Sequence, residues 1–158
     1  MTDPITQRSL DFIGQCSDPK KLWQIASNAE RQSNAEVREA ARRRLYAVLP
    51  SEEPGTLEHD VWQSIHALED TLTNERNKTT RLARTRQKIK RDGETVTVAD
   101  LIMKRASDGF RMLMERNLPA LTFEAVALRH REHFDVAVLA AAKARLAEAG
   151  YEADAVRD

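Results

Sequence analysis

The chain has 158 residues, of which 41% are hydrophobic and 32% charged, and its 25 basic and 25 acidic side chains give a formal net charge of zero. This composition argues against wholesale disorder, and the length suits one domain with or without an appendage. No apolar run approaches the roughly 18 residues of a membrane span, and no signal peptide is evident. A single cysteine, Cys16, cannot form an internal disulfide. We therefore expect a non-membrane protein of the reducing cytoplasm.

The zero net charge hides a strong segregation along the chain. Residues 1–73 carry 8 Lys and Arg against 12 Asp and Glu, and residues 92–158 carry 9 against 12. Between them lies the basic segment, residues 74–91, with 8 cations and a single acid, a balance of +7. Such a segment binds a polyanion, or it docks on acidic parts of its own chain or of a partner. Its cations are Arg76, Lys78, Arg81, Arg84, Arg86, Lys88, Lys90 and Arg91.

The first fifty residues predict helices joined by a tight turn. Asp3 and Asp18 each precede a proline, which places a side-chain acceptor at the cap and the proline at the first helical position. Asn34 caps a further apolar stripe of helical spacing. Residues 1–50 are therefore the predicted N-terminal helical hairpin region, with its turn near residues 33–34.

Residues 56–91 predict one long central helix. Thr56 can cap it, and no Gly or Pro interrupts the following residues up to 91, a length of about 50 Å at about 1.5 Å per residue. Its first half has the apolar spacing of a coiled coil. An isolated helix of this length is unstable, so the stripe must bury against the hairpin, the C-terminal helices or a second copy, and we favour a dimer. The predicted self-association residues are Val61, Ile65, Leu68 and Leu72.

Residues 92–150 predict a cluster of short helices. The sequence ETVTV at 94–98 can form a strand, or it can lead into a helix capped at Thr97, and we favour the helix. Residues 151–158 predict a frayed tail. The predicted fold class is all-α: an N-terminal helical hairpin, one long central helix and a C-terminal cluster of short helices. The caps of the later helices are predicted at Ser107, Thr122 and Asp135.

No motif in the chain points to catalysis. The sequence has no glycine-rich phosphate loop, no Gly-x-Ser-x-Gly motif and no zinc-ligand spacing. His59 and His66 are seven residues apart, too far along a helix to share an ion, and no third ligand accompanies His130 and His133. We therefore predict a non-enzymatic protein with no metal, no cofactor and no small-molecule substrate.

We predict that the basic segment contacts nucleic-acid phosphates, as in a regulatory or accessory protein. Five of its eight cations are arginines, whose planar fork suits phosphate, and Arg81, Arg84, Lys88 and Arg91 form its densest cluster on a helical wheel. No base-reading group is evident, so we expect duplex DNA to bind with modest sequence preference and strong salt dependence. Two alternatives remain. The segment is a solvated face or an intramolecular dock, or the protein is an interaction or adaptor module that self-associates or docks through the central helix.

Overall fold

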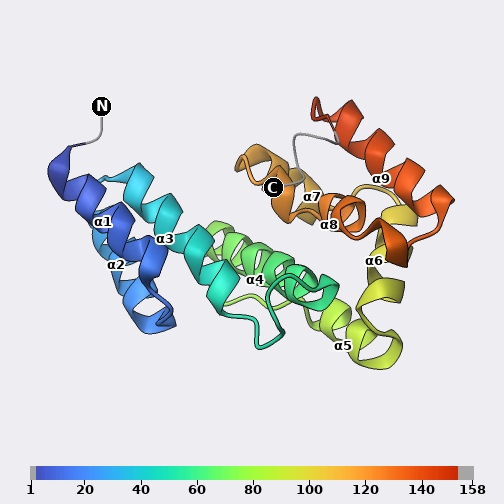
Figure 1. Ribbon diagram of the computed structural model, residues 1–158, viewed down its shortest axis with the longest axis horizontal. Helices are drawn as coiled ribbons and strands as arrows, with labels where there is room; N and C mark the ends of the chain where they lie inside the picture. The colour runs from blue at the N-terminus through green and yellow to red at the C-terminus, as the bar shows by residue number, and fades with distance from the viewer. Residues whose placement is uncertain (1–2, 153–158) are drawn as a thin grey trace. The chain divides into compact units, whose positions relative to one another are not determined.

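The computed structural model describes residues 3–152. The chain divides into two compact units, an N-terminal unit that ends at Ser51 and a C-terminal unit that begins at Glu52. All regular elements of residues 3–152 are helices, as Figure 1 shows, so the predicted all-α class is confirmed. None of these helices is both long enough and apolar enough to cross a membrane.

The N-terminal unit consists of three helices, α1 (Pro4–Gln15), α2 (Pro19–Arg31) and α3 (Ala35–Val48). Helices α2 and α3 form the predicted hairpin, and α1 packs against α3. The shared core is made of small and branched side chains that recur at helical spacing. Its buried members are Ile13, Cys16, Leu22, Ala26, Ala29, Val37, Ala41 and Leu45.

Each of these three helices begins at its predicted cap. The Asp3 carboxylate accepts hydrogen bonds from the backbone N–H groups of Ile5 and Thr6, at 3.0 and 2.9 Å. Asp18 accepts from the N–H of the second helical residue of α2. Asn34 Oδ1 accepts from the backbone of α3, while its Nδ2 donates to Thr6 Oγ1 at 3.1 Å. The Asn34 cap therefore also ties the start of α3 to α1.

The C-terminal unit holds six helices joined by short connections. They are α4 (Leu57–Arg76), α5 (Ala83–Asp92), α6 (Glu94–Met103), α7 (Asp108–Glu115), α8 (Phe123–Arg129) and α9 (Val136–Glu148). Two single-turn 3₁₀ helices, η1 (Pro119–Leu121) and η2 (Arg131–His133), flank α8. Helices α6, α7 and α8 each pack against α4, and α9 covers α6 and α8. The N-caps of α7, α8 and α9 are the predicted Ser107, Thr122 and Asp135.

The long helix α4 is present but ends at Arg76, so the predicted continuation to residue 91 is wrong. Asn77 adopts the left-handed conformation (φ 56°, ψ 29°), which terminates the helix. The reason lies in tertiary contacts, because Glu69 hydrogen-bonds Leu82 and Arg86 from the following segment. In an unbroken helix, Glu69 and Arg86 would lie about 25 Å apart along the axis. The chain has to reverse for them to meet.

Helix α6 confirms the helical interpretation of ETVTV but starts earlier than predicted. Its N-cap is Gly93, with φ 90° and ψ 168°, a conformation that residues with a Cβ rarely adopt. Thr97 is buried inside the helix and donates its hydroxyl to the Gly93 carbonyl at 2.8 Å. A single glycine therefore joins α5 to α6 in place of the predicted lead-in.

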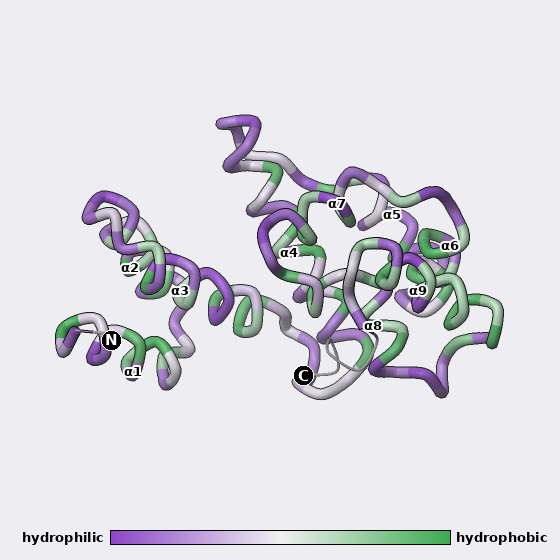
Figure 2. The backbone as a smooth tube through the Cα atoms, turned by 90° about the horizontal axis from the view of Figure 1, so that it is seen from above, coloured by the Kyte–Doolittle hydropathy of each residue, from purple (hydrophilic) through white to green (hydrophobic). Residues whose placement is uncertain are grey.

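The core of the C-terminal unit draws on both ends of its sequence. Figure 2 shows that α8 and α9 consist largely of hydrophobic residues. Tyr151 packs on this core, so the prediction of a frayed tail is wrong at this residue. The rest of that prediction, residues 153–158, lies outside the described residues. The fully buried side chains of the core include Val61 and Ile65 from α4, Val98 and Ile102 from α6, Val126 from α8, and Ala142 and Leu146 from α9.

Candidate functional site

The cations of the basic segment are spread over three local structures. Arg76 ends α4, Lys78 and Arg81 lie in the connection at residues 77–82, and the other five lie on α5. Two side chains of α4 hold the second half of the connection by hydrogen bonds. Thr73 Oγ1 accepts a hydrogen bond from the backbone N–H of Thr80 at 3.0 Å, and Glu69 accepts one from Leu82 at 2.9 Å. The segment is therefore an ordered part of the C-terminal unit.

Three of the eight cations are engaged by carboxylates of the same chain. Arg86 pairs with Glu69 at 2.6 Å, and Arg91 pairs with Asp92 at 3.1 Å. Lys88 Nζ lies 2.7 Å from a carboxylate oxygen of Asp100 on α6 and 3.1 Å from one of Asp92. Hydrogen bonds to these two acids raise the pKa of Lys88. Two members of the predicted four-cation cluster, Lys88 and Arg91, are thus partly neutralised.

The other five cations are exposed, and we call them the unpaired cations. Among the residues that the structure describes, none of these five side chains forms an ion pair with Asp or Glu. They lie within residues 76–90, a stretch of sequence that contains no Asp or Glu. The unpaired cations are Arg76, Lys78, Arg81, Arg84 and Lys90.

Glu69 is the anchor that fixes α5 beside α4. Burial alone would raise its pKa, but hydrogen bonds from Arg86 and from the Leu82 backbone outweigh this and hold the pKa below its ordinary value. The Arg86 guanidinium also lies over the Trp62 ring, 5.2 Å from its centroid. The Trp62 indole N–H donates to Glu94 at 3.2 Å. This network stabilises the scaffold and leaves Arg86 enclosed.

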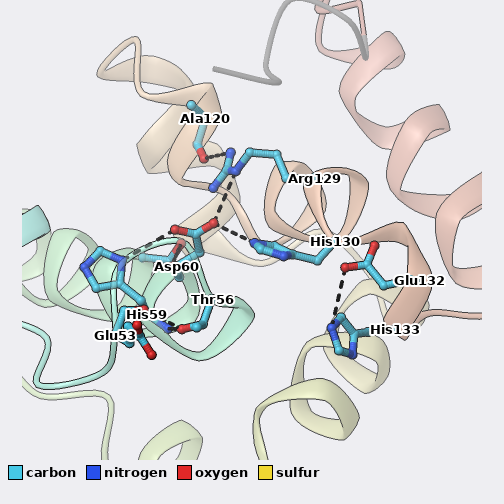
Figure 3. Close-up of polar contacts among 10 residues, drawn as sticks. Glu53, Thr56, His59, Asp60, Ala120, Arg129, His130, Glu132 and His133 are labelled. Atoms are coloured by element: carbon cyan, nitrogen blue, oxygen red, sulfur yellow. Dashed lines mark hydrogen bonds and ion pairs between the residues drawn. The ribbon is translucent and has the colours of Figure 1, made fainter.

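A second polar cluster surrounds Asp60 (Figure 3) and connects α4 to the end of α8. His130 Nε2 lies 2.7 Å from Asp60 Oδ2, and Arg129 Nε lies 3.4 Å from the same oxygen. His59 Nδ1 is 3.6 Å from Asp60 Oδ1. Burial acts to raise the pKa of Asp60, but the His130 hydrogen bond and the Arg129 charge hold it below the ordinary value. Arg129 also donates to the Ala120 carbonyl at 2.7 Å.

The Asp60 cluster clamps α4 to the end of α8 through its side chains. An Asp–His pair can orient an imidazole for proton transfer, but such chemistry also requires a reacting partner within reach. The neighbouring Ser64 hydroxyl donates its hydrogen bond to the Asp60 backbone carbonyl at 3.1 Å. Within residues 3–152 no three candidate ligands are grouped as a metal site would require. No local pattern indicates this pair, since Asp60 and His130 are 70 residues apart.

The predicted self-association residues differ in how deeply they are buried. Val61, Ile65 and Leu68 are buried inside the C-terminal unit, so the C-terminal helices supply the packing that the stripe requires. Leu72 is half-buried and, with Leu68, lines a cavity of about 410 Å³. A dimer is therefore not needed to cover the first half of the stripe.

That cavity lies beside the basic segment, which contributes Arg76, Leu82 and Thr85 to its lining. Helices α4, α6, α7 and α8 contribute to its walls, together with Leu82 and Thr85. The sequence offered no sign of it, because its lining comes from residues 68 to 145. Its apolar lining includes Leu72, Leu82, Leu101, Phe110 and Phe123, and its cationic lining includes Arg76, Lys104, Arg105 and Arg145.

Comparison of the chain with known protein families, with curated proteins and with solved structures finds no match.

Proposed function

We propose that the C-terminal unit binds nucleic acid, specifically duplex DNA, by contacting backbone phosphates with the unpaired cations of the basic segment. The observation that carries this proposal is the set of five exposed cations, gathered within fifteen residues of an ordered helix–connection–helix structure. Arginine and lysine at such positions make charge-assisted hydrogen bonds to phosphate oxygens.

The order of the connection supports the proposal. Thr73 and Glu69 hold the backbone on either side of Arg81, and the Thr80 hydroxyl donates a hydrogen bond to the Lys78 carbonyl at 3.0 Å. A pre-formed arrangement loses less conformational freedom on binding than a mobile loop does. The neutral donors Asn77 and Thr79 are exposed beside these cations and can reach phosphate oxygens as well.

The ion pairs reduce the number of cations in the basic segment that we expect to contact phosphates. Arg86 is enclosed by Glu69 and Trp62, and Lys88 and Arg91 are shared with Asp92. Phosphate contacts are therefore assigned to the unpaired cations. The rival module that docks through the central helix is less favoured, since Val61 and Ile65 are already buried.

Salt dependence provides the test. Each phosphate contact on duplex DNA contributes about −0.9 to the slope of log affinity against log salt, so five contacts predict a slope of about −4.5. Binding of a fluorescent random-sequence duplex is followed by anisotropy over a series of salt concentrations. The double variant Arg81→Gln/Arg84→Gln removes two contacts, so its slope should be about −2.7.

The matched control is Arg116→Gln/Lys143→Gln, which removes the same charge from exposed positions of the same unit. It should leave the slope within about 0.5 of the parent value, because neither residue belongs to the basic segment. Equal loss in both variants would mean that total charge, and not this surface, governs binding. Absence of binding at low salt, or a salt-insensitive partner, would refute the proposal and favour the interaction-module alternative.

A further inference from the structure

The cavity beside α4 is lined by apolar side chains that stay partly exposed to solvent. Leu72, Leu82 and Leu101 are only partly buried, although each carries a large hydrophobic side chain. Phe110 and Phe123 share this partial burial from the opposite helices α7 and α8. Each such side chain forgoes about 25 cal/mol for every Å² of apolar surface left in water. An apolar ligand that displaced this water would recover that free energy.

The volume suits a small molecule. The cavity measures about 410 Å³, within the range of roughly 300–1,000 Å³ that is typical of ligand sites. Gly109 permits the close approach of α7 to α4, since a Cβ at that position would lie 2.8 Å from Leu68 Cδ2. A side chain at position 109 would displace the end of the Leu68 side chain, which also lines the cavity.

The charges around the cavity are not balanced. Arg145 already has partners within the protein. It pairs with Glu124 at 3.0 Å and donates a hydrogen bond to the Lys104 carbonyl, and its guanidinium lies 6.0 Å from the centroid of the Phe110 ring. Burial raises the pKa of Glu124, which lies in the wall beneath it. Asp108, the other acid of the lining, is paired with Arg111 at 3.3 Å.

Three exposed cations of the lining form no such ion pair with the acids of the lining. Arg76, Lys104 and Arg105 come from the end of α4 and from the α6–α7 connection, and none is ion-paired by the acids that line the cavity. A ligand whose hydrophobic body fills the cavity would therefore place an anionic group beside them. Arginine and lysine favour carboxylate and phosphate groups at such positions.

We propose that this cavity is a binding site for a small amphiphilic anion, of the class of medium-chain acyl carboxylates. The acyl chain contacts the leucines and phenylalanines of the wall, and the carboxylate lies at the opening near Lys104 and Arg105. The inference does not rest on the proposed DNA binding, and the two sites share only Arg76.

The probes are octanoate and its uncharged analogue octanol, added to the full isotope-labelled chain and followed by NMR chemical shifts. We expect saturable shifts at the backbone amides of Leu101, Gly109 and Phe123, with octanoate binding about fivefold more tightly than octanol. Lys104→Gln/Arg105→Gln, at exposed positions, should abolish that preference and leave octanol binding unchanged. Arg81→Gln/Arg84→Gln should leave octanoate binding unchanged, which separates this site from the DNA surface.

A cavity-filling variant supplies the second arm. Leu72→Trp places a larger side chain in the cavity and should lower octanoate affinity at least about tenfold. The matched control is Val96→Trp, at a position of α6 that is 47% exposed and outside the lining, and it should bind as the parent does. Shifts that are absent, that persist in Leu72→Trp, or that are equal for octanoate and octanol in the parent would overturn the proposal.

Discussion

Glu69 and Arg86 are 17 residues apart in the sequence, yet their side chains make two parallel hydrogen bonds of 2.6 and 2.7 Å. The same carboxylate accepts the backbone N–H of Leu82. One residue of α4 thus fixes both the end of the connection and the position of α5. Because α5 carries most of the basic segment, Glu69 also determines where those cations are displayed.

Glu69→Ala is expected to destabilise the C-terminal unit by about 2 kcal/mol. The substitution leaves the Arg86 guanidinium and the Leu82 N–H without their acceptor in a partly buried position. Urea unfolding of the parent and the variant measures the change. The control Glu75→Ala lies on the exposed end of the same helix and should change stability by less than about 0.5 kcal/mol. Equal effects of the two substitutions would contradict this role for Glu69.

Stability should decrease as the pH falls below about 6.5, with His66 responsible for the first part of the loss. Burial lowers the pKa of His66 from its ordinary value of 6.5. The negative charge of Glu69 acts to raise this pKa and the positive charge of Arg86 acts to lower it, and the net shift is downward. The unfolded chain therefore binds more protons than the folded chain, so stability is complete above the unfolded pKa and declines as pH falls toward the folded pKa. Urea midpoints at about pH 7 and about pH 5 for the parent and His66→Asn provide the measurement. A variant that loses as much stability over this interval as the parent would refute the assignment.

Asp60 and His130 should show a coupling free energy of about 1–2 kcal/mol in a double-mutant cycle. Their contact of 2.7 Å is partly buried and joins α4 to the end of α8. The cycle uses Asp60→Asn, His130→Gln and the double variant, with unfolding free energies as the readout. Glu132 and His133 form the control pair, because they are exposed and 3.6 Å apart, and their coupling should be close to zero. A coupling below about 0.5 kcal/mol for Asp60 and His130 would show that the clamp adds little.

Gly93→Ala should destabilise the chain by about 1–3 kcal/mol. The position has open space around a new Cβ, so the penalty comes from the backbone conformation at φ 90° alone. Gly14→Ala is the matched control: it also meets nothing within 4 Å, but it lies inside α1, where alanine should stabilise by up to about 1 kcal/mol. Thermal unfolding distinguishes the two, and equal signs would contradict the expectation.

The local features of this fold were readable from the sequence. A cap such as Asn34 or Thr122 acts on the N–H groups two or three residues away, so its signal is contained in a short stretch. The end of α4 was not readable, because Asn77 and its neighbours contain no Gly or Pro. The break follows from Glu69, whose partners lie 13 and 17 residues onward. Propensity alone favoured a continuous helix, and a tertiary contact overrode it.

The candidate sites divide in the same way. The basic segment was visible as a run of charge, but the neutralisation of Lys88 by Asp100 required the α5–α6 turn at Gly93. The cavity was hidden for a related reason. In one continuous helix Leu72 and Leu82 would lie about 15 Å apart along the axis, whereas the reversal after Arg76 places both in the lining of one cavity.

The two cores are completed at very different moments of translation. The buried residues of the N-terminal unit end at Leu45, so that core needs no residue that is made after α3. The core around Val61 and Ile65 needs Val138, Ala142 and Leu146 from the last helix. We expect the N-terminal unit to fold early in synthesis, whereas the C-terminal unit cannot complete its core until α9 has emerged from the ribosome. A nascent chain stalled near residue 130 would therefore carry one protease-resistant unit followed by a susceptible one.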